Sequence, residues 1–110
     1  MNLEELYKLI KAKALVLINS NGDIVDSFHE DNIYDLKNFS ALTKIMVDMV
    51  DDFFTQILDL DYSNEIIVKS GNHFFYVLKY NQEHVLCVLA EGLVNISLIS
   101  LSLKKKMKNE

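Results

Sequence analysis

The stretch 39–60, FSALTKIMVDMVDDFFTQILDL, limits most strongly what this chain can fold into. At about 100° per residue its polar side chains fall within one narrow arc, as an amphipathic helix requires. The apolar side chains spread over roughly 220°, whereas one sheet covers a stripe of little more than about 100°. The apolar positions are Leu42, Ile45, Met46, Met49, Val50, Phe53, Phe54, Ile57, Leu58 and Leu60. We therefore expect a helix over 39–60 that is either enclosed in its own domain or partly reserved for another molecule.

The composition is that of one folded domain spanning residues 1–110. Half of the 110 residues are hydrophobic and a quarter are charged, and the chain has no proline. The net charge is −5, and all 11 basic residues are lysines. The absence of arginine and of a basic excess argues against a nucleic-acid partner.

Two features of the sequence indicate the cellular compartment of the protein. The single cysteine, Cys87, can form no internal disulfide, which is typical of an intracellular protein. The N-terminal residues MNLEELYKLIKAK contain no uninterrupted apolar segment, and no stretch approaches the length of a transmembrane helix. We expect a cytoplasmic protein that does not insert into a membrane.

The first third of the chain predicts a short helix and a β-hairpin. Apolar side chains recur at helical spacing over residues 2–11. Asn21 and Gly22 then separate two β-prone runs, and an Asn-Gly pair in that position is a strong hairpin signal. Strands are expected at 13–19 and 24–28, the second at a sheet edge, and a loop at 29–38.

Three strands follow the long helix as a meander, at 65–69, 73–80 and 84–90. The last two are apolar on both faces, whereas 65–69 alternates charged and aliphatic residues and is expected at the other edge. Residues 94–108 fit either a strand, from the alternation of serine and leucine, or a helix with lysines in its last turn. We prefer the helix, because it supplies a second cover for the sheet. The expected fold is α+β, a single five-stranded antiparallel sheet with helices on both faces.

The sequence offers little that would support catalysis. His29, His73 and His84 have no metal-ligand spacing, and Cys87 lies in the middle of an apolar strand. No phosphate-binding glycine motif is present. The acidic positions of the long helix are interpreted as its solvated face. We therefore expect no enzyme activity, no metal and no cofactor.

The order helix, two strands, helix, three strands, helix resembles the roadblock family of dynein light chains and their bacterial and archaeal relatives. Two segments carry the resemblance: 3–27, LEELYKLIKAKALVLINSNGDIVDS, and 88–106, VLAEGLVNISLISLSLKKK. Family members often have a glycine just before the first strand, where this chain has alanines and lysines at 11–14. Many also carry arginines in the last helix, where this chain has only lysines.

The resemblance implies a dimer, with an identical or a related chain, in which two long helices pack antiparallel and the following strands join into one sheet. The implied interface residues on the helix are Leu42, Ile45, Met46, Met49, Val50 and Phe53, and those on the edge strand are Glu65, Ile66, Ile67, Val68 and Lys69. The flank of the helix that meets the sheet stays open: it is either the side of Ile45 and Met49 or the side of Val50 and Phe54.

Similar proteins are platforms or co-regulators for Ras-like small GTPases, so the resemblance implies such a partner. Two alternatives are a structural adaptor subunit that does not sense the nucleotide, and a small-molecule sensor with a pocket between sheet and helix. Because the chain has no arginine, it cannot supply an arginine finger to a GTPase. Any effect on hydrolysis must act through the GTPase's own switch residues.

Overall fold

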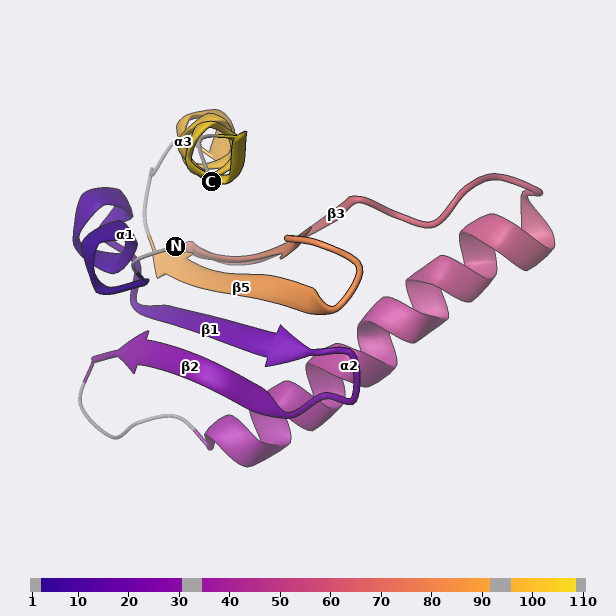
Figure 1. The fold of residues 1–110 in the computed structure, drawn as a ribbon, viewed down its shortest axis with the longest axis horizontal. Coiled ribbons are helices and arrows are strands. Elements are labelled where there is room, and N and C mark those ends of the chain that lie inside the picture. Colours follow the sequence, from indigo (N-terminus) through magenta and orange to yellow (C-terminus); the bar gives the residue numbers. More distant parts are fainter. Residues whose placement is uncertain (1–2, 31–34, 92–95, 109–110) are drawn as a thin grey trace.

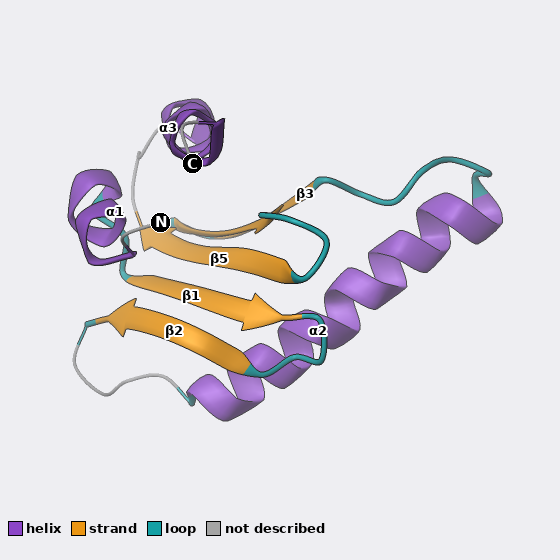
Figure 2. Ribbon diagram, in the orientation of Figure 1, coloured by secondary structure: helices purple, strands orange, loops and turns teal. Residues whose placement is uncertain are grey.

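The computed structural model describes residues 3–30, 35–91 and 96–108, with side chains for all of these except 96–98 and 106–108. Its elements are α1 (Leu3–Ile10), β1 (Ala14–Asn19), β2 (Ile24–His29), α2 (Leu36–Asp52), the π-helical turn η1 (Phe53–Ile57), β3 (Glu65–Ser70), β4 (His73–Lys79), β5 (His84–Glu91) and α3 (Ile96–Lys108). Figure 2 shows how the helices are placed around one sheet. The α+β class and the order of elements are confirmed. The helix expected at 94–108 is confirmed for Ile96–Lys108, and residues 94–95 lie outside the described part.

The five strands form one antiparallel sheet in the order β2-β1-β5-β4-β3. β2 and β3 are the edges, as their charged residues predict. The hairpin between β1 and β2 is closed by Asn19, whose side-chain oxygen accepts hydrogen bonds from the backbone N–H groups of Asn21 and Asp23. Gly22 takes φ +87°, which favours glycine at that position.

Helices cover both faces of the sheet (Figure 1). On one face α1 and α3 pack through Leu6, Ile99 and Leu103 onto side chains of β1, β4 and β5, among them the fully buried Tyr76. On the other face α2 contributes Val47 to a smaller core with Val16, Ile18, Val77 and Cys87. Side chains of the central strands alternate between these two cores, which explains why these strands are apolar on both faces.

The long helix has different ends from those expected. It begins at Leu36, because the Asp35 carboxylate accepts a hydrogen bond from the backbone N–H of Asn38 at 3.1 Å and so caps the first turn. The expected loop at 29–38 is therefore wrong for 36–38, and residues 31–34 lie outside the described part. After η1 the helix stops, and Asp59 takes φ +55°. The expected helical ending at 58–60 is wrong.

The other elements agree with expectation to within two residues, which is the usual uncertainty of such boundaries. In the described ranges no helix has the length and apolar character that crossing a membrane requires.

Candidate interaction surface

One side of the long helix exposes a row of large apolar side chains. Leu42, Ile45, Met49, Phe53 and Ile57 are each more than half exposed, and we call these five residues the apolar flank. They recur at spacings of three or four residues, so they lie along one side of α2 and η1. An exposed apolar row of this length on a small domain is typical of a protein contact.

The opposite side of α2 rests on the sheet. Thr43 and Val47 are buried there, and Val50 and Phe54 are half-buried. The open question of the flank is thereby answered, because the side of Val50 and Phe54 lies nearer the sheet while Ile45 and Met49 face outward.

The expected interface residues of the helix therefore divide into two groups. Leu42, Ile45, Met49 and Phe53 belong to the apolar flank. Met46 and Val50 are half-buried, and Met46 packs against the core beneath α2.

The edge strand β3 provides a second accessible surface. Ile67 and Val68 are each nearly half exposed, whereas Ile66 packs against the core under α2. In the described part of the chain β3 pairs only with β4, so its outer edge is open. The segment from η1 back to β3 extends past the sheet (Figure 1) and carries exposed Leu58, Leu60 and Tyr62.

A half-buried ion pair attaches this projecting segment to the sheet. Lys79 in β4 donates to the Asp51 carboxylate at 2.5 Å, and the backbone N–H and the hydroxyl of Ser63 donate to the same carboxylate at 2.9 and 2.7 Å. Burial alone would raise the pKa of Asp51, but the hydrogen bonds from Lys79 and Ser63 outweigh it and leave that pKa lowered. The ionised Asp51 side chain thus links α2 to β4 and to the chain before β3.

A second network joins β3 to the C-terminal helix. The Glu65 carboxylate accepts hydrogen bonds from Lys104 at 2.7 Å, from the Tyr76 hydroxyl, and from Ser100 at 3.4 Å. Lys104 and Tyr76 lower the pKa of Glu65. Desolvation and the neighbouring carboxylate raise the pKa of Tyr76 to about 12.

The single cysteine, Cys87, is fully buried in the core beneath α2. Burial raises the pKa of Cys87 to about 12, so its thiol stays protonated. Within the described ranges no three His, Cys, Asp or Glu side chains lie close enough together to hold a metal ion.

The sheet order, the helix on each face and the open edge beside the long helix define a roadblock/LC7-type fold. Among solved structures, MglB of Myxococcus xanthus superimposes with a TM-score of 0.86 at 19% identity, covering 94% of this chain and 84% of that chain. A Roadblock/LC7 domain from Streptomyces avermitilis gives a TM-score of 0.83 at 15% identity, covering 99% of this chain and 94% of that chain. The gliding protein MglB from Thermus thermophilus gives a TM-score of 0.82 at 15% identity, covering 96% of this chain and 78% of that chain.

The sequence matches no protein-family model and no curated protein. The likeness to these structures therefore shows a shared fold.

Proposed function

We propose that this chain is a member of the roadblock family and acts as a non-catalytic, dimeric domain in the cytoplasm, as a platform or co-regulator for a Ras-like small GTPase. The observation that carries the proposal is the apolar flank, an exposed row of five large side chains beside an open strand edge. A second copy would cover both features at once, since a two-fold contact uses the same surface on each subunit.

We infer an antiparallel pairing of the two long helices, as the resemblance to the roadblock family implies. In this pairing the apolar flank of one copy lies on that of the other. Lys44 and Asp48 stay outside the contact, because they pair with each other at 2.7 Å on the opposite side of α2.

The apolar flank is arranged evenly about Met49. With Met49 on the two-fold axis, Ile45 of one copy meets Phe53 of the other, because both lie four residues from the centre. Leu42 then lies near Ile57. In this arrangement β3, with exposed Ile67 and Val68, is the strand expected to pair with its twin.

Dimerisation is tested by size-exclusion chromatography with light scattering. We expect the unchanged chain to be a dimer at micromolar concentration and Met49→Asp to be a monomer with unchanged circular dichroism. Burying an apolar side chain of this size stabilises a contact by about 1.5 to 3 kcal/mol. Since the change occurs in both copies, the dissociation constant should rise at least about a hundredfold.

Leu9→Asp is the matched control, since Leu9 is 60% exposed on α1, away from the apolar flank. It should remain dimeric. A stable monomer for the unchanged chain, or a Met49→Asp protein that dimerises as well as the Leu9→Asp control, would remove the main support for the proposal.

The partner is tested by a pull-down with candidate Ras-like GTPases from the same cell, each loaded with GDP or with a non-hydrolysable GTP analogue. Preferential capture of one loaded form is the expected result, because the switch segments of such GTPases differ between the two states. Equal capture, or none, favours the adaptor alternative. Because the chain has no arginine, any acceleration of hydrolysis must act through the GTPase's own switch residues.

A further inference from the structure

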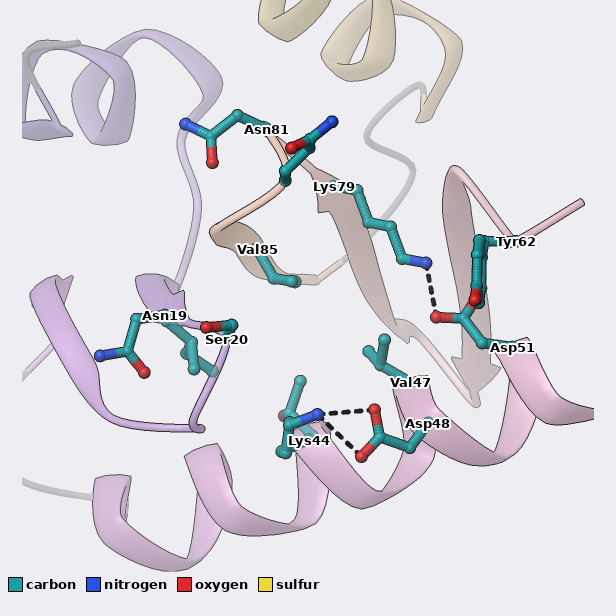
Figure 3. A pocket seen from close by; sticks show the side chains of 13 residues that line it. Asn19, Ser20, Lys44, Val47, Asp48, Asp51, Tyr62, Lys79, Asn81 and Val85 are labelled. Carbon is teal, nitrogen blue, oxygen red and sulfur yellow. Dashed lines mark hydrogen bonds and ion pairs between the residues drawn. The ribbon is translucent and has the colours of Figure 1, made fainter.

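A pocket of about 640 Å³ lies on the side of α2 away from the apolar flank. It opens where β1 and β4 end and β5 begins, above the middle of α2, and Tyr62 in the chain before β3 also lines it (Figure 3). Its volume is within the range of roughly 300 to 1,000 Å³ that small-molecule sites occupy.

The floor of the pocket is apolar. Ile18 and Val47 belong to the core beneath α2, and Val85 lies beside them at the start of β5. Figure 3 shows Val47 and Val85 in the centre of the view, surrounded by polar side chains. A ligand for this floor needs an apolar group of a few carbon atoms.

The rim carries two pairs of opposite charges. On α2, Lys44 donates to both oxygens of Asp48, at 2.7 and 2.8 Å. On the other side Lys79 is paired with Asp51, and the Tyr62 ring lies 5.4 Å from the Lys79 ammonium. The lining therefore has no net charge, although both signs are present on it.

This balance selects the charge of a ligand. An anion close to Lys44 would also lie close to Asp48, whose negative charge repels it. A cation close to Asp48 would likewise be repelled by Lys44. A molecule with one positive and one negative end can satisfy both, since its ammonium can approach Asp48 while its carboxylate approaches a lysine.

We propose that this pocket binds a small zwitterion with an apolar body, of the kind represented by a short apolar peptide with free ends. The ammonium lies against Asp48, the carboxylate against Lys44 or Lys79, and the apolar side chains lie on Val47 and Val85.

The site is compatible with the proposed dimer and does not depend on it. At about 100° per residue, the pocket-lining positions of α2 and the apolar flank point in average directions that differ by roughly 170°. A second copy on the apolar flank therefore leaves the pocket open, and one helix carries both surfaces.

The test is isothermal titration calorimetry of the full chain with the dipeptide leucyl-leucine. Two analogues each remove one charge: N-acetyl-leucyl-leucine lacks the ammonium, and leucyl-leucine amide lacks the carboxylate. We expect saturable binding of the dipeptide and a loss on the order of tenfold for each analogue. Absence of dipeptide binding, or equal binding of all three compounds, would overturn the proposal.

Two variants locate the site. Asp48→Asn should weaken the dipeptide about tenfold and strengthen the N-acetyl analogue, because Lys44 loses its partner. Asp52→Asn, an exposed neighbour outside the pocket, should change neither. Ser20→Trp should fill the pocket and abolish binding, whereas Asn72→Trp, in the turn between β3 and β4, should not.

Amide chemical shifts of the unchanged chain provide a measurement that needs no variant. Titration with leucyl-leucine should move the signals of Ser20, Val47 and Val85. Shifts confined to the apolar flank, or a Ser20→Trp protein that binds normally, would show that the dipeptide binds elsewhere.

Discussion

Lys104 in α3 and Glu65 in β3 form a hydrogen-bonded ion pair of 2.7 Å that joins the last helix to the edge of the sheet. The same carboxylate accepts from the buried Tyr76 hydroxyl, so the pair is anchored in the core beneath α3. Because β3 is also the strand proposed to meet its twin, the Glu65 carboxylate links the contact of α3 with the sheet to the proposed dimer edge.

Replacing Glu65 by Gln should destabilise the fold by about 1 to 2 kcal/mol at neutral pH, since charge-assisted hydrogen bonds are lost. The pKa of Glu65 is lowered in the folded state, so its contribution is fully present above its ordinary value of 4.5. That contribution is lost as the pH falls through the lowered value. Urea unfolding of both proteins at several pH values should therefore show a difference that disappears in acid.

The control for this prediction is Glu83→Gln, in the exposed turn between β4 and β5. It should have little effect at any pH. A difference between the unchanged chain and Glu65→Gln that persists unchanged below the lowered pKa would show that the carboxylate charge is not the cause.

Most of the architecture was predictable because local patterns and the global fold agree. The Asn-Gly turn and the strands apolar on both faces follow directly from residue types. The width of the apolar arc at 39–60 also predicted surplus apolar surface on the long helix. Its orientation was not predictable, because both candidate flanks are apolar. The buried side of α2 includes the polar residues Ser40 and Thr43. The Ser40 hydroxyl donates a hydrogen bond to the Lys37 carbonyl.

The interactions that attach the helix to the rest of the molecule were missed. Asp51 looked like part of a solvated acidic face, but its partners Lys79 and Ser63 lie 28 and 12 positions away. Sequence spacing carries no signal for such contacts. The Asp35 cap was different, since an aspartate just before an apolar periodic run is a recognisable helix start.

Asp51→Ala should cost about 2 to 4 kcal/mol of folding stability, because it leaves the Lys79 ammonium and the Ser63 donors without their acceptor in a half-buried site. The neighbouring change Asp52→Ala removes an exposed carboxylate and should cost less than about 0.5 kcal/mol. Chemical denaturation measures both. Equal losses would mean that the Asp51 contacts contribute nothing beyond the charge of this segment.

Gly22 and Gly71 both have positive φ, but only at Gly22 would an added Cβ lie close to another side chain. Alanine substitutions at these two positions therefore separate the effect of backbone strain from that of steric crowding. At Gly71, φ is +57° and an added Cβ would meet no atom within 4 Å, so Gly71→Ala should cost about 1 kcal/mol from backbone strain alone. At Gly22, φ is +87° and the Cβ would lie 3.3 Å from the Lys44 Cβ. Gly22→Ala should therefore be the more destabilising in thermal unfolding. The reverse order would show that the turn over Lys44 adapts readily.

The position of Met49 on the proposed two-fold axis can be tested by cross-linking. Met49→Cys places a thiol opposite its own copy, so mild oxidation should give a disulfide-linked dimer on a non-reducing gel. The native Cys87 does not interfere in the folded protein, since it is buried and its pKa is raised to about 12. Leu9→Cys, equally accessible on α1, should cross-link slowly and only with rising protein concentration. If both variants cross-link at the same rate, the helices do not meet at Met49, and the antiparallel arrangement of the apolar flank is wrong.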